Sequence, residues 1–268
     1  MQQIRELEKK IEKKLGKEQA SEGGDRVFGE NDDKFHFLVN IAVIGTVDKT
    51  DLLIQHIYDG DPRHAPPELV NDGIMMYKEK YEPGKVFEIH YWDYPGTEEL
   101  RPLTMRLAQE AAGTIYVYDV NDSDSYHDLA SWMLPPGKPE DEGKFPKILI
   151  GMMTDEQQRR VITQEEAEEF ANAQHLTYFE VDLANPDAAL HDPFVKLIHM
   201  VHMVITSASS KGPTAMLELR RHGIIYGSKI WDSPGGATPQ QRQTIESNLL
   251  PFEGATTDRF PWLEQSSC

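Results

Sequence analysis

Five short runs of apolar, β-branched and aromatic residues recur along the middle of the chain, and the stretches between them place apolar residues every three or four positions. The runs cover Phe37–Ile44, Val86–Trp92, Thr114–Val120, Ile148–Met152 and Tyr178–Val181. Runs of this composition are typical of buried β-strands, and the intervening period is typical of amphipathic helices. This alternation predicts an α/β fold with a mostly parallel sheet.

The segments between the runs carry specific helix signals. Residues Thr97–Ala112 have a helical period, and Thr163 followed by Glu166 forms a capping box that opens a second helix. A third helix is indicated by a buried stripe made of Leu190, Phe194, Leu197, Ile198, Val201 and Val204. We expect the domain to close near Ile205, where this stripe ends.

The two ends of the chain differ from this middle part. Near the N-terminus, Ile4, Leu7, Ile11 and Leu15 recur among lysines and glutamates, which predicts a short amphipathic helix. A polar, glycine-containing linker follows. The sequence therefore predicts an N-terminal helix and linker over residues 1–34, one domain over 35–205 and a C-terminal extension over 206–268.

The C-terminal extension keeps both helix signals and apolar residues. Pro213–Arg221 predicts a short helix stopped by Gly223, and Thr238 before Pro239 predicts the start of another. Its apolar anchors are Ile224, Ile225, Tyr226, Ile230, Trp231, Phe252, Phe260 and Trp262. We expect this tail to dock on its own domain or on a partner. Truncation after Ser210 should leave the domain folded, but should weaken partner binding or expose an apolar patch that makes the domain aggregate.

Composition narrows the classes of partner. Of 268 residues, 39% are hydrophobic, which is enough for one well-buried domain with extensions. The formal charge of 27 − 45 = −18 argues against nucleic acid as a partner. The apolar runs are too short for stable membrane insertion, and the charged N-terminus is unlike a signal peptide. The single cysteine, Cys268, fits a reducing compartment, so the sequence predicts a cytoplasmic protein.

The turn after the first apolar run has the layout of a phosphate-binding loop with altered spacing. Gly45 is followed by Lys49 and Thr50, but the functional loop places its lysine six residues after the first glycine and directly after a second one. Here Asp48 precedes the lysine. A shorter loop offers phosphate fewer N–H donors, and a carboxylate about 4 Å from a phosphate charge costs roughly 4 kcal/mol at an effective dielectric of about 20. Lys49 either binds phosphate or begins a solvated helix.

Three longer segments carry a family resemblance in their order and spacing. They are YWDYPGTEEL (Tyr91–Leu100), AAGTIYVYDVNDSDSYHDLASWM (Ala111–Met133) and PKILIGMMTDEQQRRVITQEEAEEFA (Pro146–Ala171). Together they resemble the small GTPases of the Ras superfamily, most closely the Rab-like branch, over about residues 35–205. The resemblance implies a P-loop GTPase-like three-layer domain, with a six-stranded, mostly parallel sheet wrapped by about five helices and a nucleotide site at the carboxyl ends of the strands.

The resemblance also implies which residues would hold GTP or GDP with Mg²⁺. They are Gly45, Lys49, Thr50, Asp93, Gly96 and Asp155, with Thr50 and Asp93 as the magnesium ligands. Several positions depart from the family pattern: Thr97 replaces the water-orienting glutamine, and Met152 and Met153 replace the polar pair that reads guanine. The first switch, between Tyr58 and Tyr81, has no threonine, and the last loop (Val181–Asn185) does not match. Asp93–Gly96 can equally be a simple turn.

Other kinds of site have weaker signals. His199 and His202 lie three apart on a helix, but no further ligand completes a metal set. No GxSxG-like nucleophile elbow is present. Cys268 lacks the second cysteine of prenylated Rab-like chains and is not four residues from the end.

The fold pattern is intact while the nucleotide motifs are damaged, so the sequence predicts a Rab-like pseudo-GTPase that acts as a protein-binding or scaffold subunit of a larger assembly. We expect it to have no catalytic activity and to bind no nucleotide cofactor. It would bind protein partners through its N-terminal helix and apolar tail. We expect a cytoplasmic location in a cytoskeletal, ciliary or trafficking assembly. The alternative is an atypical small GTPase that binds GTP weakly and hydrolyses it slowly as a regulatory switch.

Overall fold

The computed structural model describes residues 35–58, 68–71, 74–81, 86–133, 145–154, 159–184, 186, 188–211 and 213–226. The predicted N-terminal helix, the second tail helix at Thr238, Asp155 and Cys268 lie outside the described residues.

The order of elements alternates strands with helices, as the apolar pattern predicts. The strands are β1 (Phe37–Ile44), β2 (Glu68–Asn71), β3 (Ile74–Tyr81), β4 (Phe87–Asp93), β5 (Gly113–Asp119), β6 (Lys147–Met153), β7 (Thr177–Asp182) and β8 (Ile224–Tyr226). The α-helices are α2 (Thr50–Tyr58), α3 (Arg101–Gln109), α4 (Ser123–Trp132), α5 (Gln164–Ala173), α6 (Asp192–Lys211) and α7 (Pro213–Arg220), and the 3₁₀ helix η2 (Ala188–His191) precedes α6.

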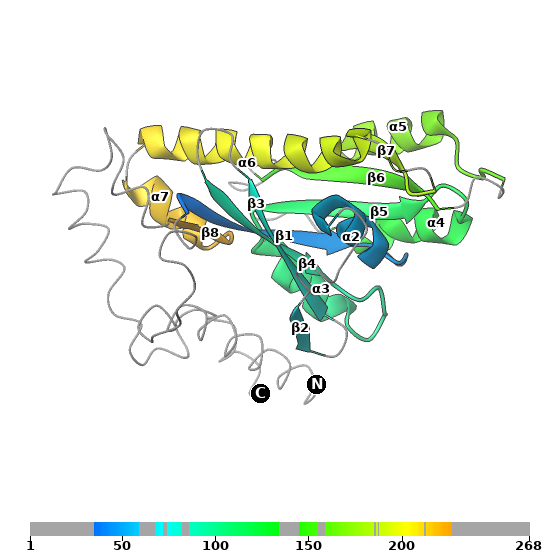
Figure 1. Cartoon of the computed structure of the whole chain (residues 1–268), viewed down its shortest axis with the longest axis horizontal. Helices are drawn as coiled ribbons and strands as arrows, with labels where there is room; N and C mark the ends of the chain where they lie inside the picture. Colours follow the sequence, from blue (N-terminus) through cyan, green and yellow to red (C-terminus); the bar gives the residue numbers. More distant parts are fainter. Residues whose placement is uncertain are drawn as a thin grey trace.

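The strands form one sheet in the order β2-β3-β4-β1-β5-β6-β7, with β8 also paired to β1 (Figure 1). Strands β4, β1, β5, β6 and β7 are mutually parallel, whereas β3 is antiparallel to β4. The predicted mostly parallel α/β fold is confirmed. Within the described residues, the six longer strands form the predicted sheet, and the short strands β2 and β8 are additions to it.

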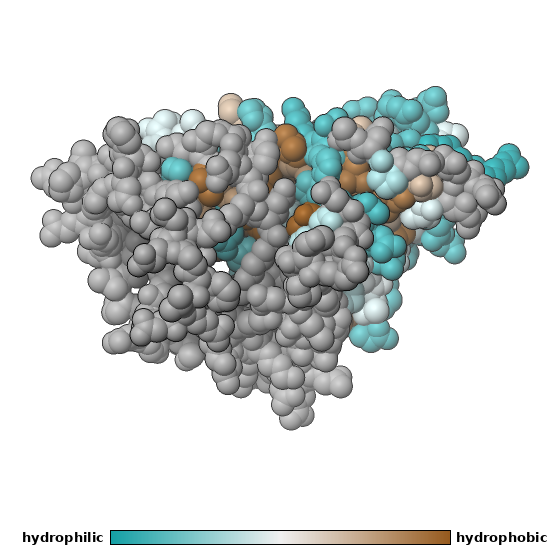
Figure 2. Space-filling view, in the orientation of Figure 1, coloured by the Kyte–Doolittle hydropathy of each residue, from teal (hydrophilic) through white to brown (hydrophobic). Residues whose placement is uncertain are grey.

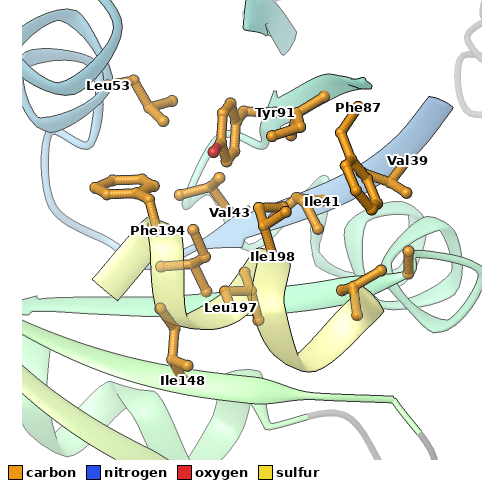
Figure 3. Close-up of a cluster of buried hydrophobic side chains, with 14 of the residues drawn as sticks. Val39, Ile41, Val43, Leu53, Phe87, Tyr91, Ile148, Phe194, Leu197 and Ile198 are labelled. Carbon is orange, nitrogen blue, oxygen red and sulfur yellow. The ribbon is translucent and has the colours of Figure 1, made fainter. Parts of the chain in front are cut away.

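Helices cover both faces of the sheet, because the central strands are apolar on both sides. One core cluster joins strand residues such as Ile41 and Val43 to Leu53 of α2 and to Phe194 and Leu197 of α6 (Figure 3). The other joins the alternate strand residues to helices α3, α4 and α5, through Leu103, Leu129, Trp132, Ala167 and Ala171. Strand side chains alternate between the faces with a period of two, which gives the three layers.

Local signals set the ends of helix α5. Thr163 Oγ1 accepts a hydrogen bond from Glu166 N at 3.2 Å, and Glu166 Oε2 accepts one from Thr163 N at 3.0 Å. This confirms the predicted capping box. The exposed side of α5 carries Glu165, Glu168 and Glu169, and the described surface at this end of the molecule is hydrophilic (Figure 2).

The first part of the C-terminal extension packs on the sheet. Helix α7 ends at a turn in which Gly223 has a φ of +65°, the left-handed conformation that glycine adopts without strain. Strand β8 then pairs with Phe37–Val39 of β1, while β5 pairs only with Ile41–Ile44. Strand β8 therefore fills the place beside the first half of β1 that β5 does not reach.

The compact part of the chain consequently runs past the expected boundary at residue 205. Ile205 lies inside α6, which continues to Lys211. Leu219 of α7 and Ile224 of β8 are both 0% exposed and belong to the core cluster formed with α6. Docking of the tail on its own domain is thus observed as far as Tyr226.

Among the described helices, none combines the length and the apolar character needed to cross a bilayer.

Candidate functional site

The site lies where two parallel strands end at the same edge of the sheet. Gly45 follows β1, and Asp93 is the last residue of β4, paired in register with Val43. Helix α2 starts at Thr50, directly after the loop Gly45–Lys49. This arrangement brings Gly45, Lys49, Thr50, Asp93 and Gly96 together, as the resemblance implies for a nucleotide site.

The Lys49 side chain is buried within the loop and is only 4% exposed. Its Nζ donates hydrogen bonds to the backbone oxygens of Gly45 at 3.0 Å and Val47 at 3.3 Å. It also lies 3.3 Å from Asp93 Oδ1. An ammonium group has three N–H donors, and three acceptors from the chain surround it. The reading in which Lys49 merely begins a solvated helix is therefore wrong.

Asp93 links the loop to the start of α2. Thr50 Oγ1 donates to Asp93 Oδ2 at 3.2 Å, while Lys49 pairs with the other carboxylate oxygen. Burial raises the pKa of the Asp93 carboxyl above its ordinary value, although the nearby Lys49 charge and the hydrogen bonds from Lys49 and Thr50 oppose this effect. Both carboxylate oxygens thus have partners within the protein.

Asp48 occupies the N-terminus of α2 with its own carboxylate. Asp48 Oδ1 accepts a hydrogen bond from Thr50 N at 3.1 Å, and the residue is exposed. A free amide in the first turn of a helix is the group that would bind a phosphate oxygen. From the sequence, Asp48 is expected only to repel phosphate; in the structure its carboxylate also accepts the first amide of helix α2, two residues further on.

The phosphate loop (Gly45–Lys49) is in close contact with strand β5 on one side and with the turn after Asp93 on the other. A Cβ added to Gly45 would lie 2.3 Å from the carbonyl oxygen of Val117 on β5. A Cβ added to Gly96 would lie 2.5 Å from the carbonyl oxygen of Gly45 and 2.7 Å from Thr46 Cα. The two glycines are therefore required by close backbone approach, and the turn after Asp93 rests directly on the loop.

Among the positions that would read a guanine base, those that the structure describes are apolar or internally bonded, and Asp155 lies outside the described residues. Met152 is 0% exposed within the core cluster of α2 and α6, and Met153 packs against the cluster on the opposite face. In the last loop, Leu183 N donates to the carbonyl of Met153 at 2.8 Å and Ala184 N donates to Asp182 Oδ1 at 2.9 Å. Thr97, at the position of the catalytic glutamine, is exposed.

These residues do not fit a nucleotide with Mg²⁺. The lysine charge is neutralised by Asp93, and the first amide of helix α2 (Thr50 N) is bonded to Asp48. A buried methionine, Met152, and its neighbour Met153 stand in place of the polar pair expected for guanine. Thr50 and Asp93 keep the residue types of magnesium ligands, but they are bonded to one another. In the described part of the chain, no group of three or more His, Cys, Asp or Glu side chains is placed to hold a metal, His199 and His202 included.

Comparison with known proteins agrees with the geometry of the fold. Residues 40–203, which are 164 of the 268 residues, match the Ras family. The chain is also similar to the GTP-binding protein YPT1 of Saccharomyces cerevisiae, with 23% identity over 206 residues. That alignment covers 76% of this chain and 98% of the yeast protein.

Proposed function

Because the chain belongs to the Ras family, whose members are small GTPases, we propose that it is a Rab-like pseudo-GTPase that keeps the family fold as a protein-binding platform. It would act as a scaffold subunit of a larger cytoplasmic assembly, and its conformation would not be switched by a nucleotide. In this proposal the chain keeps the fold of the family without its nucleotide chemistry, since a fold alone does not determine a function.

The state of Lys49 is the observation that carries this proposal. In a working phosphate loop, the lysine reaches the β- and γ-phosphates. Here its ammonium group is 4% exposed and has Gly45 O, Val47 O and Asp93 Oδ1 as acceptors. A phosphate could reach it only by breaking these contacts and leaving Asp93 buried without its cation, which is a costly exchange.

The base site supports the same conclusion. A site that selects a base by hydrogen bonds loses most of its discrimination when the polar groups are removed. Met152 contributes its side chain to the hydrophobic core and has no exposed surface. Met152 therefore fills the hydrophobic core at the position where guanine recognition needs a side-chain amide.

Partner binding in this proposal is assigned to the two extensions and the domain surface. The N-terminal segment has an amphipathic pattern at Ile4, Leu7, Ile11 and Leu15, and the tail retains Trp231, Phe252, Phe260 and Trp262. Large aromatic side chains are common anchors in protein interfaces.

We expect the purified chain to show no saturable binding of fluorescent GTP or GDP analogues in Mg²⁺ below about 100 μM, a dissociation constant that corresponds to roughly −5.5 kcal/mol. The reason is that Lys49 is already bonded to Asp93 and to two backbone oxygens, and that apolar Met152 stands where guanine would be recognised. The measurement is a fluorescence anisotropy titration, with an adenosine analogue as the control for non-specific binding. Magnesium-dependent binding of the guanosine analogue below 1 μM (about −8.2 kcal/mol) would refute the proposal.

One observation favours a second candidate, a small GTPase that binds GTP weakly and hydrolyses it slowly. Thr50 Oγ1 and Asp93 remain 3.2 Å apart at the loop, with the residue types that would hold a magnesium ion. The same titration separates the two candidates, because this one requires a guanosine response that depends on Mg²⁺.

Repairing the loop should raise any residual nucleotide affinity. Asp48→Gly combined with two residues inserted before it removes the carboxylate from the helix N-terminus and adds amide donors, whereas Asp48→Gly alone should do less. Both variants are titrated with the same analogues, and their melting temperatures are compared with that of the wild-type chain, since Asp48→Gly also removes the hydrogen bond to Thr50 N. Tight binding by the single variant would show that loop length is unimportant.

A further inference from the structure

The turn that follows β4 is fixed by four separate contacts to the phosphate loop and to the residues that flank it in β1 and α2. We define the second switch as residues 93–100. Asp93 is bonded to Lys49 and to Thr50 through its two carboxylate oxygens. Tyr94 N donates to the carbonyl of Val43 at 3.3 Å, and Gly96 lies directly against Gly45.

Next to these contacts, the Tyr94 side chain anchors the switch in the hydrophobic core. The Tyr94 residue is 5% exposed and belongs to the core cluster of helices α3, α4 and α5. The phosphate loop has no room to move away from Gly96, because Gly45 in this loop already lies against the carbonyl of Val117 on β5. The switch is thus anchored in the core by its own Tyr94 side chain, and its Gly96 rests against a closely packed loop.

Contacts of this kind make a bound phosphate unnecessary for ordering the switch. A nucleotide orders a switch segment when its phosphate and magnesium ion supply the contacts that hold it. Here Lys49 supplies the positive charge to Asp93, and Thr50 supplies the hydroxyl donor, from within the chain. Thr50 and Asp93 are 43 positions apart in the sequence, and this hydrogen bond joins them directly.

We infer that the second switch is held permanently in one conformation by Lys49, Thr50 and Gly96, so that the surface it presents to partners does not depend on nucleotide. This inference rests on the proposed function and extends it to the regulation of the same site. A ligand shifts a conformation only if it binds two states differently. A switch whose contacts are all supplied by the chain leaves a nucleotide no second state to select.

Hydrogen exchange of the full-length chain tests this inference at residues 93–100. In the wild-type chain, the Tyr94 amide, which donates to Val43 O, should exchange slowly. Exchange across residues 93–100 should change by less than about twofold on adding 1 mM GDP or a non-hydrolysable GTP analogue with Mg²⁺. Thr50→Val removes the hydroxyl donor with little change in shape and should speed exchange about three- to tenfold. Gly96→Ala, which brings a methyl group against the Gly45 carbonyl, should speed it by a larger factor. Thr177→Val on the edge strand β7 is the matched control and should leave residues 93–100 unchanged.

The outcomes separate the inference from the proposed function. If neither Thr50→Val nor Gly96→Ala alters exchange at residues 93–100 and no nucleotide binds, the inference is overturned while the pseudo-GTPase proposal stands. If either nucleotide protects these residues in the wild-type chain, both are overturned. Faster exchange in the two variants, with no response to nucleotide, supports both.

Discussion

We expect Lys49→Met to lower the free energy of unfolding by about 3–5 kcal/mol, because breaking a buried ion pair leaves an uncompensated charge. Lys49 and Asp93 have side chains that are 4% and 9% exposed, and their charged atoms lie 3.3 Å apart. Methionine preserves most of the volume of the lysine chain but cannot bond to Gly45 O, Val47 O or the carboxylate. The loss should appear in urea unfolding followed by circular dichroism, without any nucleotide present.

A double variant and an exposed pair serve as controls for Lys49→Met. Lys49→Met combined with Asp93→Asn removes both charges and should recover much of the loss. Arg160 and Glu180 form a pair with side chains 37% and 28% exposed, so Arg160→Met should cost at most about 1 kcal/mol. If Lys49→Met cost no more than Arg160→Met, Lys49 would not be a structural cation, and the proposed function would lose its main support.

Truncation after Ser210 should destabilise the domain by about 3–6 kcal/mol or make it insoluble. It removes Leu219 and Ile224, which are both 0% exposed, and burial of each such side chain contributes roughly 1.5–3 kcal/mol. It also removes the β8 strand and uncovers the backbone of Phe37–Val39. The sequence predicts that the truncated domain stays folded, because its apolar stripe ends near Ile205; the structure indicates that the domain itself loses stability, because its core continues to Ile224.

A second truncation, after Tyr226, isolates the contribution of α7 and β8. The two shortened chains differ only by residues 211–226, so the difference in their unfolding free energies measures what that segment contributes. Thermal and urea unfolding of both, beside the full chain, gives the comparison. Equal stability of the two shortened chains would show that the packing of Leu219 and Ile224 is not needed by the domain.

The parts of the fold that depend on neighbouring residues could be predicted from the sequence. The capping box needs only Thr163 and Glu166, three residues apart, and it is present as expected. The run Phe37–Ile44 is a strand over those same residues, because a buried central strand is apolar throughout. Short-range patterns thus gave the order of the layers and the edge of the sheet where the site lies.

The features that depend on distant residues could not be predicted in this way. Ile224–Tyr226 was recognised only as a group of apolar anchors, since nothing local shows that its partner is β1. Strand β3 has only a short apolar half, Ile74–Tyr77, followed by Lys78, Glu79 and Lys80, so its sequence does not stand out as that of a buried strand. The burial of Lys49 is set by Asp93, more than forty residues away, and the polar residues beside Lys49 suggested a solvated position instead.

The antiparallel pair of β1 and β8 also determines how the domain would respond to tension. Phe37, at the start of β1, lies opposite Tyr226, at the end of β8, so the two chain extensions leave the described domain about one strand spacing apart, roughly 4.8 Å. A pulling force between them would load the hydrogen bonds of this pair one after another from that end, as in unzipping, and not all at once, as in shear. Strand β8 would therefore be the first strand that such a force detaches, while the parallel strands around β1 stayed paired.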